Sequence, residues 1–251
     1  MTVTTYENSE RGRVCAELLG AAPEAARLRE VIILPIPSVA GGKIRGTDIP
    51  ISRISDGVGE GDAVVGYSLP PPFTEGLRER GVLVFDAALD GEFLYENAAL
   101  TAEAALGIIL SSERRAPRDI EFGIAGYGRI GRQLVNMLLF LGARVRVFTT
   151  SERRRLELGE AGISAELLPL AEGASLGVDI LINTAPATLF SPESLTRDGG
   201  MRIIELASGD NFDEKIKVEK YPALPARVFP ESAGRALYRA ASRALLGGGY
   251  E

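Results

Sequence analysis

Six consecutive residues at positions 126–131, Gly-Tyr-Gly-Arg-Ile-Gly, constrain the fold of this chain more than any other segment. They directly follow the apolar run 120–125, and an amphipathic segment comes after them. A strand, a glycine-rich turn and a helix in this order are typical of a loop that holds a phosphate group. Gly126 permits the tight turn, Gly128 leaves room for a pyrophosphate, and Gly131 lets the helix pack closely on the strand.

The apolar pattern on both sides of this motif predicts strands and helices that alternate through short connections. After residue 119, strands are expected at 120–125, 144–149, 178–183 and 202–206, and helices at 129–141 and 152–161. Before it, shorter strands are expected at 31–36, 63–67 and 82–85, and a long helix near 94–111. The predicted fold class is therefore α/β, with a doubly wound parallel-sheet Rossmann domain and a smaller α/β substrate domain.

A polar segment that contains Pro117 marks the expected boundary between the two domains. We expect the substrate domain at 1–115 and the dinucleotide-binding Rossmann domain at 116–230. A C-terminal helix within 231–251 has apolar residues at helical spacing and is expected to pack back on the first domain. The solvated face of this helix is expected to carry Arg235, Arg239 and Arg243.

The absence of histidine among the 251 residues excludes every mechanism that needs an imidazole. These include Ser-His-Asp hydrolysis, His-ligated zinc and the His-carboxylate relay of many hydride-transfer enzymes. A single cysteine, Cys15, favours the reducing cytoplasm and predicts no metal site. The net charge of −6 argues against nucleic acid as a partner. No uncharged apolar run approaches the ~20 residues that span a bilayer, so no membrane partner is expected.

The end of the second strand of the dinucleotide-binding domain is expected to distinguish NAD from NADP, because an NAD site usually carries Asp or Glu there. This chain has Thr149 at that position, followed by Thr150, Ser151, Glu152 and Arg153. Hydroxyl groups followed by arginine suit a 2′-phosphate, which a guanidinium binds through two hydrogen bonds. We therefore predict NADP, with Ser151 and Arg153 as contacts. An inward-facing Glu152 would favour NAD instead.

Two further loops, at 183–186 and 206–208, follow later strands of this domain. The carboxyl ends of such strands line the crevice where a dinucleotide lies. The expected cofactor contacts are Gly126, Tyr127, Gly128, Arg129, Ile130, Gly131, Thr149, Thr150, Ser151, Arg153, Asn183, Thr184, Ala185, Pro186, Leu206, Ala207 and Ser208.

Several segments match, in order, the signature blocks of one known family. The second half contributes IAGYGRIG at 124–131, LGARVRV at 141–147, DILINTAP at 179–186, ELAS at 205–208 and LPARVFPESAG at 224–234. The first half contributes VIILPIP at 31–37, GKI at 42–44 and ENAALTAEAAL at 96–106. Together these segments resemble the A chain of dipicolinate synthase, its nicotinamide-binding component. The chain departs from the family by lacking a clear opening strand and by continuing ELAS with Gly209-Asp210-Asn211 in place of a Pro-Gly-Gly-type turn. Leu224-Pro225-Ala226 likewise replaces an LPG-type turn.

The resemblance implies an oxidoreductase that oxidises a dihydrodipicolinate-type precursor to dipicolinate, the pyridine dicarboxylate of bacterial spores. It also implies a second, flavoprotein-like subunit. By analogy with this fold class we expect a homodimer. A small dicarboxylate substrate calls for cations and hydroxyl groups. We expect Lys43 as the cation and Glu103 as the catalytic carboxylate, with Glu96 as an alternative. The residues expected to bind the substrate are Ser38, Asn97 and Thr101.

Two alternatives stay open at this point. The Rossmann blocks alone are shared with shikimate and hydroxyacid dehydrogenases, although the usual hydroxyacid enzymes need a histidine that this chain lacks. A non-catalytic NADP-binding sensor protein would also carry the same cofactor motif. Aromatisation of a dihydropyridine supplies its own driving force, so hydride transfer without an imidazole is compatible with the first interpretation.

Overall fold

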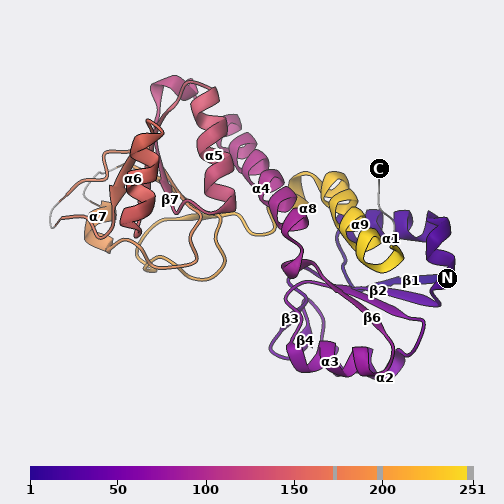
Figure 1. Cartoon of the computed structure of the whole chain (residues 1–251). Coiled ribbons are helices and arrows are strands. Elements are labelled where there is room, and N and C mark those ends of the chain that lie inside the picture. The colour runs from indigo at the N-terminus through magenta and orange to yellow at the C-terminus, as the bar shows by residue number, and fades with distance from the viewer. Residues whose placement is uncertain (172–173, 197–199, 248–251) are drawn as a thin grey trace. The chain divides into compact units, whose positions relative to one another are not determined.

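The computed structural model describes residues 1–171, 174–196 and 200–247 (Figure 1). The chain divides into two compact units, of which the first comprises Met1–Leu100 with Pro225–Glu251 and the second comprises Thr101–Leu224. Each unit is built on a parallel sheet with helices packed against it. The predicted α/β fold class is therefore confirmed. The last residues of the expected C-terminal segment, 248–251, lie outside the described residues.

The sheet of the first unit has four parallel strands in the order β1-β2-β5-β6. Its strands are β1 (Thr2–Thr5), β2 (Glu30–Ile33), β5 (Ala63–Gly66) and β6 (Leu83–Asp86). The last three lie within or beside the apolar runs that predicted them. The expectation that the chain lacks an opening strand is wrong, because β1 pairs with β2 along its whole length. Its sequence TVTT escapes an apolar search because an edge strand needs little apolar surface.

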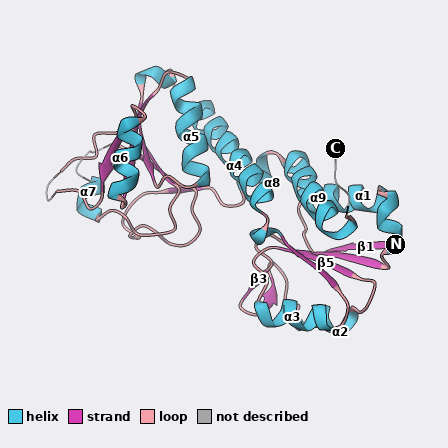
Figure 2. Ribbon diagram, in the orientation of Figure 1, coloured by secondary structure: helices cyan, strands magenta, loops and turns pink. Residues whose placement is uncertain are grey.

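Helices cover both faces of this sheet (Figure 2). Val31 and Ile33 of β2 pack with the helices on one face, whereas Ile32 packs with those on the other, because successive strand residues point to opposite sides. The first face is covered by α1 (Glu10–Ala21) and α9 (Pro230–Leu246), and the second by α2 (Ser52–Gly57) and α3 (Pro71–Glu79). Burial on both faces explains why these strands read as continuous apolar runs.

Short elements complete the connections. A two-stranded hairpin follows β2, and short helical segments follow α1, β6, α4 (Gly91–Ser112) and β12 (Glu219–Lys220). These elements are η1 (Pro23–Arg27), β3 (Val39–Ala40), β4 (Lys43–Ile44), η2 (Ala87–Leu89), η3 (Pro117–Asp119) and α8 (Leu224–Val228).

Helix α4 (Gly91–Ser112) continues from the first unit into the second without a break. The division therefore falls within this helix, after Leu100, and the polar segment expected to separate the domains at residue 115 instead follows the end of the helix. The second division follows Leu224 and not residue 230. Helix α4 is long and apolar enough, by length and composition, to cross a membrane, and less than half of its apolar stretch is buried within the protein.

The arginines of α9 do not form the solvated face that their spacing predicted. The guanidinium of Arg239 pairs with Glu96, and that of Arg243 lies 3.0 Å from Glu92 and 3.5 Å from Asp90. Only Arg235 is paired within its own helix, with Glu231. The expectation fails for Arg239 and Arg243 because packing brings α9 beside the acidic first turns of α4.

Gly234 sets how closely α9 approaches α1. A Cβ at this position would lie 2.6 Å from Cβ of Val14 and 2.8 Å from the carbonyl oxygen of Arg11. We expect Gly234→Ala to lower the free energy of unfolding by about 1–3 kcal/mol, the usual cost of overpacking. Urea titration followed by circular dichroism measures this loss. Gly76→Ala on α3, where a Cβ meets nothing within 4 Å, is the control and should not destabilise. Equal stability of Gly234→Ala and the parent would contradict this packing.

The sheet of the second unit has six parallel strands in the order β12-β11-β10-β7-β8-β9. Its strands are β7 (Glu121–Ala125), β8 (Arg144–Thr149), β9 (Ser164–Leu167), β10 (Ile180–Asn183), β11 (Arg202–Glu205) and β12 (Glu219–Lys220). Its helices after α4 are α5 (Arg129–Phe140), α6 (Glu152–Glu160) and α7 (Pro192–Thr196). The chain builds outward from β7 in one direction and then from β10 in the other, which is the doubly wound arrangement that was predicted.

Candidate functional site

The strand order of the second unit reverses between β7 and β10, and ligands of such sheets bind beside that reversal at the carboxyl ends of the strands. The glycine-rich segment follows β7 at this point. Gly126 has a φ of 88°, a left-handed conformation that favours glycine. A side chain at Gly131 would collide with the carbonyl oxygen of Gly126. At Gly128, in contrast, a Cβ would meet nothing within 4 Å, so the loop leaves open space at the start of α5.

The loop after β10 is tied to this segment. Thr184 Oγ1 donates to the carbonyl oxygens of Ala125 and Gly126, at 3.0 and 3.2 Å. Gly128 is the N-cap residue of α5 and brings no capping side chain. Because the first amide groups of a helix have no partner within the helix, they can donate hydrogen bonds to a group that carries negative charge. The structure therefore brings together the glycine-rich and 183–186 segments at a place suited to a phosphate.

Hydroxyl groups gather where β8 ends. Thr149 is almost buried, and its Oγ1 accepts a hydrogen bond from the Ser151 amide at 3.2 Å. Ser151 is the N-cap residue of α6, and its Oγ accepts from the Arg154 amide at 3.3 Å. The nearby acid, Glu152, is bound by the Arg155 guanidinium at 2.6 Å, which lowers the pKa of Glu152. Glu152 is therefore paired with Arg155 at the start of α6.

The structure separates two neighbouring arginines of α6. The side chain of Arg153 is 83% exposed, and its Nε lies 3.2 Å from Glu157. The side chain of Arg154 is 28% exposed, lies 3.0 Å from the same carboxylate and has its guanidinium carbon 5.7 Å from the centre of the Tyr127 ring. Arg154, and not the expected Arg153, therefore reaches the glycine-rich segment.

A buried carboxylate joins the loops that follow β10 and β11. Glu205 is 3% exposed and accepts hydrogen bonds from Asn183 Nδ2 at 3.0 Å, from the Ala207 amide at 2.9 Å and from Asn211 Nδ2 at 3.2 Å. Asn183 also holds the amide and carbonyl of Ala185. Burial raises the pKa of Glu205, and the hydrogen bonds from Asn183 and Asn211 act against that rise. One carboxylate thus fixes the expected contact segments 183–186 and 206–208 relative to each other.

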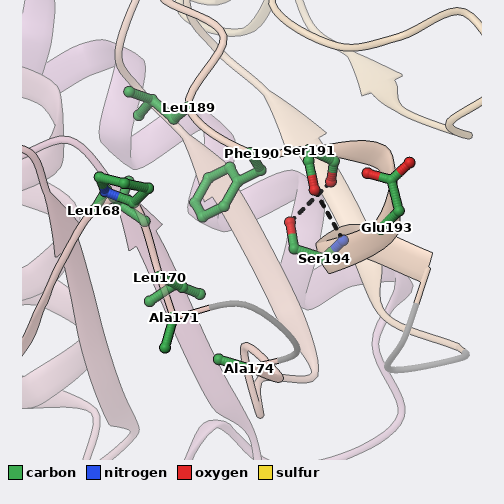
Figure 3. Close-up of a pocket in the computed structure, with 10 residues that line it drawn as sticks. Leu168, Leu170, Ala171, Ala174, Leu189, Phe190, Ser191, Glu193 and Ser194 are labelled. Atoms are coloured by element: carbon green, nitrogen blue, oxygen red, sulfur yellow. Dashed lines mark hydrogen bonds between the residues drawn. The ribbon is translucent and has the colours of Figure 1, made fainter.

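A cavity of about 440 Å³ lies beyond the carboxyl ends of β9 and β10 (Figure 3). Leu168, Leu170 and Phe190 line its apolar part, and Ser191 and Glu193 lie on the side of Phe190. The Phe190 ring packs edge-on against Phe148, with 5.6 Å between the ring centres. The cavity therefore lies at the edge of the sheet formed by the carboxyl ends of the strands, and it combines an apolar wall with polar side chains.

Two residues expected to bind substrate or act in catalysis have other partners in the first unit. Ser38 is completely buried, and its Oγ donates to the carbonyl oxygen of Pro35 and accepts from the Tyr67 amide, both at 2.8 Å. Its hydroxyl joins two loops and is not presented to a ligand, so the expected substrate contact is corrected. Lys43 lies in the β3–β4 hairpin, half exposed, with its ammonium 2.8 Å from Asp48.

The other expected residues lie along α4. Asn97 is half-buried and Thr101 is 7% exposed, while Glu103 is exposed to solvent. Glu96, the alternative carboxylate, pairs with Arg239 and serves the packing of α9 on α4. Within the described part of the chain, no group of three or more Cys, Asp or Glu side chains is placed to hold a metal ion.

Sequence reasoning missed four residues that the structure connects to the expected cofactor segments. Arg132 and Arg154 lie within predicted helices, and only the rotational phase of each helix determines which side chain faces the loop. Glu205 carries a weak sequence signal, an acid that directly follows the apolar pair Ile203-Ile204 at the end of the strand, and Asn211 carries none. The cavity residues are apolar and carry no signal of their own.

Comparison with solved structures gives the same architecture. The A chain of dipicolinate synthase from Bacillus halodurans aligns over 99% of this chain and 98% of its own, with a TM-score of 0.76 and 18% identity. The corresponding protein from Bacillus subtilis aligns over 98% and 95%, with a TM-score of 0.74 and 18% identity. At these identities the comparison establishes the fold only. The resemblance noted in the sequence is therefore confirmed for the fold.

More distant structures share this architecture. The NAD-complexed D-isomer specific 2-hydroxyacid dehydrogenase from Lactobacillus delbrueckii ssp. bulgaricus aligns over 100% of this chain and 99% of its own, with a TM-score of 0.56 and 11% identity. Among curated proteins, adenosylhomocysteinase from Sulfurisphaera tokodaii is 28% identical over 149 residues. That match spans 57% of this chain and only 34% of the relative. No family model matches the chain.

Proposed function

We propose that this chain is an NADP-dependent oxidoreductase of the type found in the A chain of dipicolinate synthase. The observation that carries the proposal is the glycine-rich turn at the strand-order reversal, with open space at Gly128 and the first turn of α5 behind it. A dinucleotide on this edge would place its pyrophosphate at that turn. The adenine would then lie toward the apolar cavity of Leu168 and Phe190, and the nicotinamide toward the segments that Glu205 joins.

NADP is favoured over NAD by the residues after β8. The strand ends in hydroxyl side chains, and the first acid of α6, Glu152, is bound by Arg155. Arginine is the residue that binds phosphate through two parallel hydrogen bonds. A carboxylate that accepts from the ribose hydroxyls, which an NAD site needs, is absent from positions 149–151.

The proposed reaction is the oxidation of a dihydrodipicolinate-type precursor to dipicolinate. A nicotinamide bound at this edge would accept the hydride, with its two electrons, that the substrate gives up, and the accompanying proton would leave to solvent or to a carboxylate. Aromatisation of the ring drives the step, so positioning matters more than a strong base. Lys43 remains the candidate cation for a substrate carboxylate, Glu103 the candidate proton acceptor, and Asn97 and Thr101 the candidate polar contacts. The fold shared with two dipicolinate synthase structures and the segments at 96–106 and 224–234 support this choice of substrate.

The same proposal includes a homodimer, a cytoplasmic location, a role in sporulation and a flavoprotein-like second subunit. The role in sporulation and the second subunit rest on the family resemblance, the homodimer on analogy with the fold class, and the cytoplasmic location on the single cysteine. A shikimate-type or hydroxyacid-type dehydrogenase and a non-catalytic NADP sensor are the competing outcomes of the test.

The proposal is tested by binding and turnover with the full chain. Titration with NADPH and NADH, followed by the fluorescence of the reduced nicotinamide, should give tighter binding of NADPH. With NADP and a dihydrodipicolinate mixture, with and without the flavoprotein-like partner, the absorbance of the pyridine dicarboxylate should rise together with that of NADPH. Tighter binding of NADH would contradict the cofactor choice. Binding of NADPH without turnover, either with or without the partner, would contradict the proposed oxidation. That result would favour the non-catalytic NADP sensor.

A further inference from the structure

Two guanidinium groups converge on one ring of the glycine-rich segment. The guanidinium carbon of Arg132, from α5, lies 5.4 Å from the centre of the Tyr127 ring, and that of Arg154, from α6, lies 5.7 Å from it. Arg132 Nε also donates to the carbonyl oxygen of Tyr127 at 3.4 Å. Tyr127 stands between Gly126 and Gly128, so the two cations flank the residue that separates the glycines of the proposed phosphate loop.

The charges around this ring do not balance. Arg132 has no carboxylate partner among the residues that the structure describes, and Arg154 shares Glu157 with Arg153. Arg132, Arg153 and Arg154 therefore have a single carboxylate partner, Glu157, between them in the described part of the chain. Like charges held near one aromatic ring repel each other, although the ring face attracts each of them. An anion with two negative charges would relieve the repulsion and accept hydrogen bonds from both guanidinium groups.

The position of the pair identifies the anion. The end of β8 is where the adenosine ribose of a bound dinucleotide lies, and an arginine near that point accommodates a 2′-phosphate. Ser151 caps α6 with its Oγ on the Arg154 amide, which fixes the phase of the helix and turns Arg154 toward Tyr127. Arg153, one residue earlier, is directed to solvent. The pyrophosphate would lie at Gly128. The 2′-phosphate is therefore the anionic group of the dinucleotide that remains for these two arginines.

We propose that Arg154 and Arg132, held against the Tyr127 ring, bind the 2′-phosphate of NADP(H), and that Arg153 takes no part. This inference rests on the proposed dinucleotide site and names the residues that give it its specificity. Tyr127 acts as a positioning residue, because its ring holds the two guanidinium planes and does not itself carry the charge that a phosphate needs.

The experiment compares two ligands that differ only in the 2′-phosphate, 2′,5′-ADP and 5′-AMP, by isothermal titration calorimetry. We expect Arg154→Ala to weaken 2′,5′-ADP by about 10- to 100-fold, the range of charge-assisted hydrogen bonds. Its effect on 5′-AMP should stay within about twofold, because the ligand lacks the group that the arginine contacts. Arg132→Ala should act in the same direction. Arg153→Ala, the matched control on the adjacent residue, should leave both affinities unchanged.

The Tyr127 variants separate positioning from direct contact. Tyr127→Phe keeps the ring and should keep the preference for 2′,5′-ADP, whereas Tyr127→Ala should lose most of it. An equal loss of both ligands in Arg154→Ala would overturn the inference, and so would a loss confined to Arg153→Ala. Because neither ligand contains nicotinamide, a failure of the proposed oxidation leaves this result intact. Equal binding of 5′-AMP and 2′,5′-ADP by the parent chain would overturn the inference. It would not contradict dinucleotide binding by this unit.

Discussion

Replacing Gly128 with alanine is expected to abolish dinucleotide binding without disturbing the fold. The residue has a φ of −82°, which any L-residue adopts, and an added Cβ meets nothing within 4 Å. The methyl group instead occupies the space that a pyrophosphate needs to reach the first amide groups of α5. We expect the Kd for NADPH to rise at least about 100-fold, which corresponds to roughly 2.7 kcal/mol. The melting temperature should stay within about 2 °C of the parent, since no contact is lost.

Two other glycines serve as controls for this substitution. Gly159 on α6 also has open space around its Cβ, so Gly159→Ala should change neither binding nor stability. At Gly131 the Cβ meets the Gly126 carbonyl oxygen, so Gly131→Ala should lower both and cannot separate the two effects. If Gly128→Ala bound NADPH as tightly as the parent, the open space at the turn would have another purpose and the proposed function would lose its main support.

The centre of the second unit was easier to predict than the short edge strands β1, β9 and β12 for a physical reason. The glycine spacing specifies a strand, a turn and a helix at once, and β8 has the bounds that its apolar pattern predicted, 144–149. In contrast, β1, β9 and β12 are short edge strands that bury little apolar surface. These strands are held by backbone hydrogen bonds to the neighbouring strand. A local sequence pattern carries little information about such pairing.

Sequence patterns predicted the site residues whose role depends on backbone conformation. They missed the residues whose role depends on helix phase or on partners distant in the sequence. The three glycines and Thr184 take part in one loop arrangement that the motif indicates. The choice between Arg153 and Arg154 depends on a rotation of about 100° along α6, which the Ser151 cap determines. Ser38 looked like an accessible hydroxyl in a loop, and only the tertiary structure reveals that two backbone groups from different loops use it.

Glu205 is expected to be the most costly side chain to remove from the second unit. Its carboxylate accepts from Asn183, Ala207 and Asn211, and all three donors are near the interior of the protein. Glu205→Leu leaves the Ala207 amide and one N–H of each asparagine side chain without an acceptor, while the other N–H groups keep the carbonyl oxygens of Ala185 and Ser208. Each buried group that loses its partner costs about 1–3 kcal/mol. We therefore expect a loss of several kcal/mol in the free energy of unfolding, measured by urea titration, together with weaker NADPH binding. Glu219→Gln, which removes a partly exposed carboxylate on the adjacent strand, should cost less.

The pH dependence of Glu205→Gln tests the same carboxylate more finely, because glutamine imitates the protonated side chain and does not titrate. Burial raises the pKa of Glu205 in the folded chain, so the folded chain binds the proton more tightly than the unfolded chain does. The contribution of Glu205 to stability is then complete below its unfolded pKa of about 4.3 and declines as the pH rises through the higher folded value. The stability of the parent minus that of Glu205→Gln should therefore decrease from pH 4 to pH 7. An increase over that range would mean that the three donors stabilise the carboxylate more than burial disfavours it. In that case Glu205 would hold the loops as a permanent anion, and the affinity for NADPH would follow no titration of this group.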